Sequence, residues 1–156
     1  MTRSHFLIIG HALHKVDGDK LLSYAPYVRE MNLWLKFAGQ VTVVAPLSED
    51  NVNALDLSYE HENITLTRIP SVNLINIKGI LHSLIVLPAI FYIIFREMGK
   101  ATHIHLRCPG NIGLIGCFVQ IFFPWKKKTA KYAGNWDWSS QQPWSYRLQQ
   151  LILRNR

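Results

Sequence analysis

Apolar positions along the chain fall into short runs and into longer stretches with a helical period. Five segments have the length and boundaries of strands, namely 5–10, 41–46, 64–70, 102–109 and 127–136. The third alternates apolar and polar side chains, which predicts a strand nearer the edge of a sheet. Four further segments predict helices, namely 23–39, 78–97, 110–123 and 143–156.

Buried strands that alternate with helices predict a parallel sheet covered on both faces, which is a doubly wound, Rossmann-like α/β fold. At 156 residues the chain is expected to form a single domain over residues 1–156. Residues 11–22 and 47–63 show no clear period and are expected to be loops, the first with a turn at Asp17-Gly18. Ser23 is the expected N-cap of the first helix.

Composition and charge narrow the class of protein. The chain is 49% hydrophobic, which excludes a disordered protein, and its two cysteines, Cys108 and Cys117, do not form a CxxC pair. The N-terminal apolar run is too short for a secretory signal, so a cytoplasmic location is expected. The net charge of +7 is concentrated after residue 125, where seven Lys/Arg accompany one acidic residue. A basic end is typical of a solvated face or of contact with anionic lipid, nucleic acid or a phosphorylated substrate, and the candidate contacts are Lys126, Lys127, Lys128 and Lys131.

Two long apolar segments raise the question of a membrane. Residues 79–95 and 110–125 contain 17 and 16 residues without a formal charge, just under the length that spans a bilayer. In an α/β domain such segments are expected to be core helices. A shallow membrane-contacting helix is the alternative, and the nearby lysines 126–128 support it.

Common cofactor motifs are missing. The first strand is followed by "GHALHKVDG", which does not match the dinucleotide fingerprint GxGxxG, and no GKS or GKT sequence occurs. His103 and His105 share one face of a predicted strand near Cys108, but a zinc site needs further ligands at defined spacing. We therefore expect no metal and no bound cofactor.

Ligands of open parallel sheets bind outside the carboxyl ends of the strands. Arg107 is suited to a phosphate or carboxylate there, and the predicted helix start at Gly110 and Asn111 favours an anion. The catalytic residue stays unassigned. The full set of residues expected on this rim is His11, His14, Asp17, Gly18, Arg107, Gly110, Asn111, Gly134, Asn135, Trp136, Asp137 and Trp138.

Four stretches together resemble one family. The sequences "HKVDGDKLLSYAPYVREMNLWLKF", "VTVVAP", "HIHLRCPGNIG" and "KYAGNWD" are similar to the N-terminal domain of retaining GT-B glycosyltransferases, in particular family-4-type enzymes of bacterial polysaccharide biosynthesis. The resemblance covers nearly the whole chain. Two features depart from it: the usual Gly-Gly of the first loop is replaced by Asp17-Gly18, and no histidine follows the fifth strand.

The resemblance implies one half of a GT-B fold. This half would bind a glycan or lipid-linked acceptor, and a C-terminal domain, in cis or as a partner subunit, would bind the nucleotide-sugar donor. Such enzymes usually need no metal, and many work at the inner face of the cytoplasmic membrane. His14, Asp17, Asn135 and Asp137 would then contact acceptor hydroxyls.

Other functions stay open at the level of sequence. One is a non-catalytic basic module that contacts an anionic membrane or nucleic acid, nucleic acid being the less expected partner. Another is an accessory subunit that docks a separate donor domain. The sequence stops within a predicted helix, which leads us to expect a further domain or a partner subunit.

Overall fold

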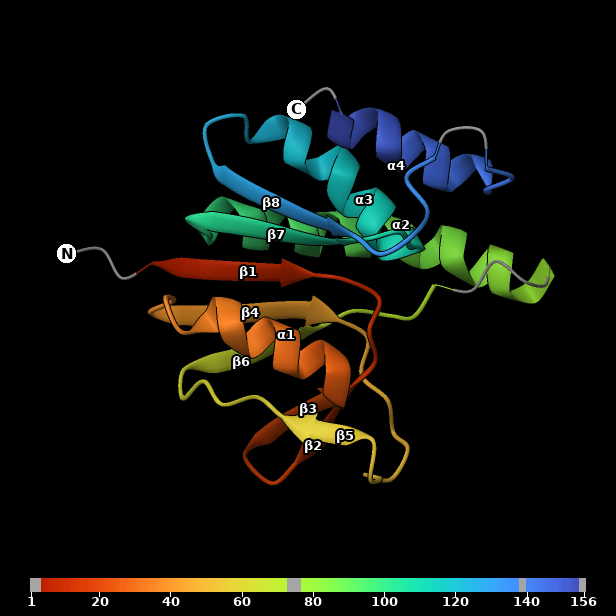
Figure 1. The fold of residues 1–156 in the computed structure, drawn as a ribbon. Helices are drawn as coiled ribbons and strands as arrows, with labels where there is room; N and C mark the ends of the chain where they lie inside the picture. The colour runs from red at the N-terminus through yellow and green to blue at the C-terminus, as the bar shows by residue number, and fades with distance from the viewer. Residues whose placement is uncertain (1–3, 73–76, 138–139, 155–156) are drawn as a thin grey trace.

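The structure is a computed structural model that describes residues 4–72, 77–137 and 140–154. Its centre is an all-parallel sheet with the strand order β6-β4-β1-β7-β8, which confirms the predicted Rossmann-like α/β fold (Figure 1). The five predicted strand segments supply its strands: β1 (His5–Ile9), β4 (Gln40–Ala45), β6 (Ile64–Arg68), β7 (His103–Cys108) and β8 (Lys127–Tyr132).

Hydrophobicity sets the position of each strand in the sheet. In β1, Leu7, Ile8 and Ile9 are completely buried, and this strand lies at the centre, paired in parallel with β4 and β7. The more polar strands β6 and β8 lie at the two edges. The edge position predicted for residues 64–70 is therefore confirmed.

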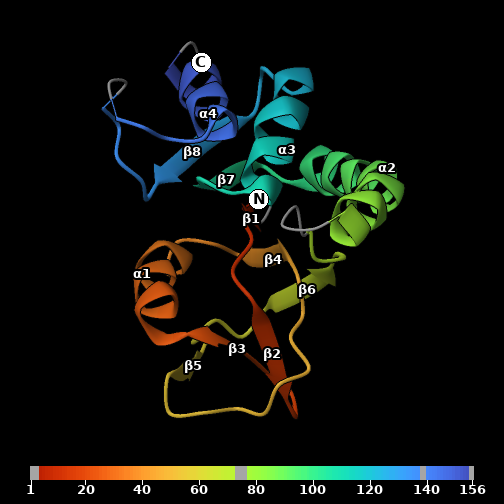
Figure 2. The ribbon, with the colours of Figure 1, turned by 90° about the vertical axis from the view of Figure 1, so that its right-hand side faces the viewer.

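Helices cover both faces of the sheet (Figure 2). One face carries α1 (Ala25–Leu35), which buries Tyr27, Val28 and Met31. The opposite face carries α2 (Ile77–Lys100), α3 (Asn111–Val119) with its 3-10 extension η1 (Gln120–Phe122), and α4 (Trp144–Arg154). The sheet thus separates two hydrophobic cores.

A small antiparallel sheet was not predicted. It consists of β2 (His14–Asp17), β3 (Lys20–Tyr24) and β5 (Asp56–Ser58), so the loop predictions for 11–22 and 47–63 are wrong at these strands and hold for residues 11–13, 47–55 and 59–63. The turn at Asp17-Gly18 does occur, and it closes the β2–β3 hairpin with Gly18 at φ +57°. Ser23 is not the N-cap of α1; it lies in β3 and its Oγ donates to the carbonyl of Leu13 at 2.7 Å, while Tyr24 precedes the helix.

The two long apolar segments behave differently. Helix α3 is a core helix as predicted, with Ile112, Cys117 and Val119 buried. The prediction of a core helix holds for only one side of α2: this side packs on the sheet, and the other side is exposed. Within the described residues it is the one helix long and apolar enough to cross a membrane by length and composition. Only 17% of its most apolar stretch of 18 residues is buried.

Candidate functional site

A cleft opens where the chain changes direction across the sheet. After β1 the chain adds β4 and β6 on one side of it, and then crosses back to add β7 and β8 on the other side. The space between the carboxyl ends of β1 and β7 is therefore the topological switch point. A cavity of about 300 Å³ lies here. Its lining residues are His11, Leu13, Pro46, Ser71, Val72, Gly110, Asn111, Ile112 and Tyr146.

Helix α3 begins at the wall of this cleft. Gly110 is its N-cap position and offers no side chain to the free N–H groups of the first turn. A Cβ atom at Gly110 would lie 2.5 Å from Nδ1 of His11, so only glycine lets the imidazole pack against the helix start. The positive end of the helix, the exposed His11 and the Asn111 amide therefore meet at one place.

Two lining residues come from segments whose contribution the sequence did not indicate. Tyr146 belongs to the first turn of α4, and α4 is fixed to α3 by Gln149, whose Oε1 accepts the N–H of Gly110 at 3.3 Å. Ser71 lies just after β6. Only the topology could have indicated these two residues, because their positions follow from the strand order and from the packing of α4 on α3.

His14 was predicted on this rim, but the structure buries it behind the rim. Its Nδ1–H donates to the carbonyl of Ala12 and its Nε2 accepts from the hydroxyl of Tyr59, both at 2.8 Å. The ring is fully buried and stacks on Tyr59. Burial lowers the pKa of His14 to about 4, so the imidazole is neutral near pH 7. His14 organises the layer around α1 rather than lining the cleft.

Arg107 was predicted to bind an anion, but it already has a carboxylate partner. Its Nη1 lies 2.8 Å from Oε1 of Glu30, and its guanidinium lies 4.7 Å from the centre of the Tyr27 ring. Glu30 also bonds Lys131 at 2.7 Å. Burial acts to raise the pKa of Glu30, but hydrogen bonds from Lys131 and Arg107 outweigh it and hold that pKa below its usual value. The charge of Arg107 is therefore largely compensated within the protein.

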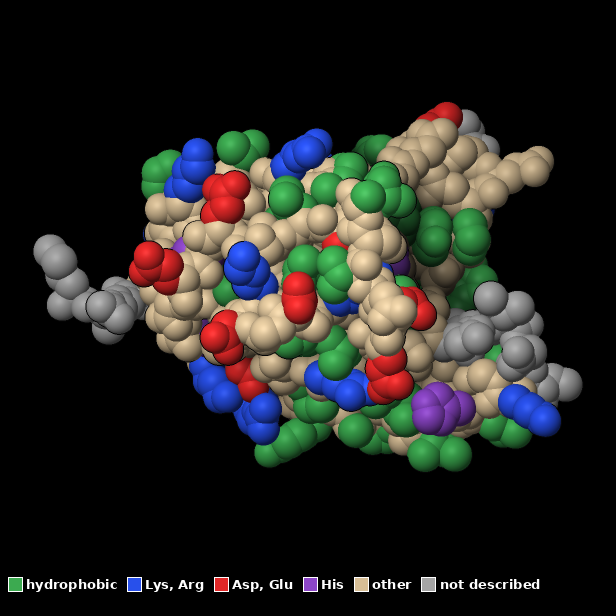
Figure 3. All heavy atoms as spheres, turned by 90° about the horizontal axis from the view of Figure 1, so that it is seen from below, with side chains coloured by type: hydrophobic (Ala, Val, Ile, Leu, Met, Phe, Trp, Pro, Cys, Tyr) green, Lys and Arg blue, Asp and Glu red, His purple; other side chains and the backbone are tan. Residues whose placement is uncertain are grey.

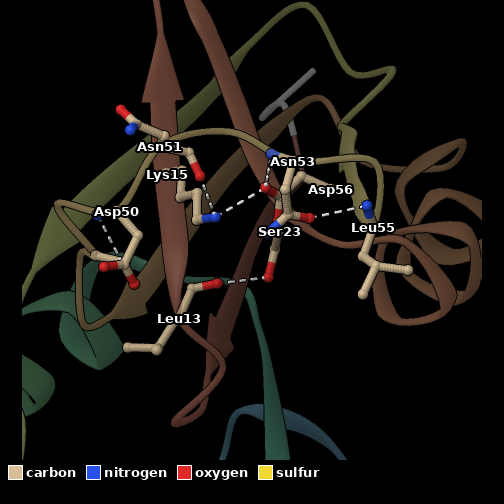
Figure 4. A network of polar contacts seen from close by, with 9 residues as sticks. Leu13, Lys15, Ser23, Asp50, Asn51, Asn53, Leu55 and Asp56 are labelled. Carbon is tan, nitrogen blue, oxygen red and sulfur yellow. Dashed lines mark hydrogen bonds and ion pairs between the residues drawn. The ribbon is translucent and has the colours of Figure 1, made fainter.

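Asp17 and Gly18 lie in the hairpin instead of at the switch point. Asp17 lines a separate hollow of about 580 Å³ with Glu49 and Asp50. Beside it, Nζ of Lys15 bonds the carboxylate of Asp56 at 2.8 Å and the carbonyl of Asn51 at 2.7 Å, which ties β2 to the loop before β5 (Figure 4). The prediction that Asp17 shares a rim with Asn111 is thus wrong, because residues 14–24 form a hairpin.

The loop after β8 approaches the cleft without lining it. A Cβ atom at Gly134 would lie 3.3 Å from Pro109, next to the start of α3. Asn135 is engaged within the loop: its Oδ1 accepts the N–H of Asp137 at 2.9 Å, and its carbonyl accepts from Gln150. Trp136 lines another hollow, and Trp138 lies outside the described residues.

That other hollow is larger, at about 630 Å³, and follows the free edge of β8. Three of the four candidate lysines of this region make internal contacts. Lys126 donates to the carbonyls of Gly99 and Ala101, Lys128 to Gln120, and Lys131 to Glu30. Lysines on an edge strand also discourage pairing with another chain. We therefore favour the smaller cleft as the site, because polar groups from several elements converge there.

The two histidines of β7 hold the sheet together. His103 and His105 both bond the hydroxyl of Thr129 in β8, at 3.0 and 2.8 Å. Among residues 4–72, 77–137 and 140–154, no group of three or more His, Cys, Asp or Glu side chains is placed to hold a metal ion.

Comparison with protein-family models, with curated proteins and with solved structures gives no match for this chain.

Proposed function

We propose that this chain is the acceptor-binding half of a glycosyltransferase that moves a sugar from a nucleotide-sugar to a glycan or lipid-linked acceptor. The observation that carries the proposal is the cleft at the switch point, where the start of α3, His11 and Asn111 converge. The Rossmann-like sheet and the sequence resemblance to GT-B enzymes add support. A volume of about 300 Å³ suits a small polar ligand.

The chemistry of the cleft fits a phosphorylated sugar. The free N–H groups and the positive end of α3 attract a phosphate or carboxylate. The imidazole of His11 and the amide of Asn111 can exchange hydrogen bonds with sugar hydroxyls. Tyr146 adds an aromatic wall with a polar tip. These groups bind and orient; the donor would be bound by a second domain, in cis or as a partner subunit.

A non-catalytic basic module is the competing function. It rested on Lys126, Lys127, Lys128 and Lys131 as a free cationic patch. Lys131 has its charge compensated by the carboxylate of Glu30, and the ammonium groups of Lys126 and Lys128 are held against backbone carbonyls and are less able to reach a nucleic acid. The cleft therefore carries the better-supported function.

Calorimetric titration with a hexose 1-phosphate tests the proposal. The wild-type chain should bind it more tightly than it binds the free hexose, because the phosphate reaches the start of α3. His11→Ala removes an exposed cleft group without opening the core and should weaken binding, while Asp17→Asn at the hairpin should leave it unchanged. Equal binding by wild type and His11→Ala, or no preference for the phosphorylated sugar, would contradict the proposal.

A further inference from the structure

Helix α2 has a second apolar side that no other part of the described chain covers. Its inner side packs Ile90, Ile94 and Met98 against the sheet, all fully buried. On its outer side every exposed side chain from Leu84 to Phe95 is apolar, apart from the hydroxyl of Tyr92. A surface helix of a globular domain normally turns polar side chains outwards, so this composition needs a partner that accepts an apolar surface.

The apolar surface continues onto the end of α3. A groove of about 470 Å³ runs between α2 and the α3–η1 segment, and all seven of its lining side chains are apolar. Phe122 closes one side, edge-on to Phe91 and Phe95 at ring distances of 6.4 and 6.1 Å. We call this surface the α2–η1 face: the exposed side of α2 from Leu84 to Phe95 together with Phe118, Ile121 and Phe122.

Positive charge is concentrated in the same half of the molecule. Residues 69–156, which include α2, α3 and α4, hold eleven Lys/Arg and two Asp/Glu, whereas residues 1–68 hold six and eight. Acidic side chains accordingly spread over the underside of the molecule, where the small antiparallel sheet lies (Figure 3). The one carboxylate in α2, Glu97, is buried and paired with Arg96 and Lys100 at 2.8 and 2.9 Å.

We propose that the α2–η1 face binds an anionic lipid bilayer, with α2 lying in the interface. The choice of a bilayer rests on charge complementarity: an apolar surface bordered by Lys78 at one end and by Arg96 and Lys100 at the other suits hydrocarbon beneath a layer of anionic headgroups. The indole of Trp125, 73% exposed beside this face, suits the headgroup level.

The helix lies on the bilayer and does not cross it. A spanning helix would have to withdraw Ile90, Ile94 and Met98 from the core that they share with β1 and β7. The proposal does not depend on the glycosyltransferase function. If both hold, the N-terminal half of α2, which projects past the carboxyl ends of the strands, brings the cleft near the lipid surface (Figure 1).

Co-sedimentation with vesicles tests the docking surface. The wild-type chain should bind phosphatidylglycerol-containing vesicles more tightly than pure phosphatidylcholine vesicles. The double substitution Leu84→Glu/Ile85→Glu should weaken binding by about tenfold or more, because charged side chains are costly in hydrocarbon. Both side chains are exposed, at 61% and 78%, so circular dichroism should show an intact fold. The control is Phe37→Glu, which places one glutamate at an 86% exposed apolar position after α1, away from the α2–η1 face.

Depth is measured with lipids brominated on their acyl chains. These should quench tryptophan fluorescence in the wild type, and Trp125→Phe should remove most of the quenching. Three results would overturn the proposal: no binding to anionic vesicles, equal loss of binding in Phe37→Glu, or a stable dimer without vesicle affinity that Leu84→Glu/Ile85→Glu dissociates. The last would mean that a second copy covers the face. Hexose phosphate binding at the cleft is unaffected by any of these, so the two proposals fail separately.

Discussion

His105 should make the folded state sensitive to mild acid. Its ring is 1% exposed and lies between Phe6 and Trp34, with ring distances of 5.8 and 5.4 Å. Nδ1 bonds the hydroxyl of Thr129, whereas Nε2 is buried without a hydrogen-bond partner. The imidazolium ion carries an N–H on both nitrogens, so protonation in either tautomer leaves a charged ring whose Nε2–H has no acceptor.

The size of the effect follows from the pKa. Burial, followed by the positive charge of Arg107, lowers the pKa of His105 from 6.5 to about 4. Between these two pH values the unfolded chain binds a proton that the folded chain does not, so the free energy of unfolding falls as the pH falls. Above pH 6.5 both states are neutral at this residue and it has no effect. Because a shift of one pKa unit corresponds to about 1.4 kcal/mol, the full loss in the free energy of unfolding is about 3 kcal/mol.

Urea unfolding from pH 7 down to pH 4 measures this loss. His105→Phe keeps an aromatic ring, removes the titration and leaves Thr129 bonded to His103, so it should lose about 3 kcal/mol less than the wild type over that range. The carboxylates with lowered pKa values, among them Glu30, titrate in both proteins, and their effect cancels in the difference. Identical pH dependence of the two proteins would refute the assignment of the proton to His105.

Further predictions concern the packing of the helices and the thiols. Gly113→Ala should destabilise the fold by about 1–3 kcal/mol, because the new Cβ would lie 2.6 Å from the carbonyl oxygen of Arg107. Gly99→Ala in α2 meets nothing closer than 4.0 Å and should be neutral or stabilising by up to about 1 kcal/mol; urea unfolding of both variants checks the pair. Cys108 and Cys117 are both buried, and their Sγ atoms lie 3.8 Å apart. The hydrogen bond between the two thiols, together with burial, raises the pKa of Cys117. Neither thiol should react with a disulfide reagent until denaturant is added, and rapid reaction of the native protein would contradict this packing.

The main sheet could be predicted because hydrophobic runs set it locally. Each of the five strands coincides with a short segment whose boundaries are visible in the sequence. The hairpin carried one local signal, Asp17-Gly18, but β5 has only three residues, Asp56–Ser58, in a polar segment without a period. Its strand character arises from pairing with β3, which the local sequence does not encode.

The candidate site was predictable only in part. Gly110 and Asn111 directly follow a buried strand, so their place at the carboxyl edge follows from local order. The positions of Arg107 and His14 depend on distant partners, Glu30 and Tyr59, which are 77 and 45 residues away along the chain. Such pairings decide whether a polar side chain faces a ligand or is satisfied within the protein.

The same limit applies to α2. A helix of 24 mostly apolar residues has the same kind of sequence pattern whether both of its sides are buried or only one. Its exposed side follows from the arrangement of elements on that face of the sheet, where α3 lies between α2 and α4 and the outer surface of α2 stays open (Figure 2).

The most direct test of the acceptor site is a residue-by-residue map of hexose 1-phosphate binding by amide chemical shifts. We predict that the shifts concentrate at His11, at Gly110–Ile112 and at Tyr146, around the start of α3. Shifts confined to the β2–β3 hairpin or to the lysines of β8, with the start of α3 unperturbed, would contradict the account.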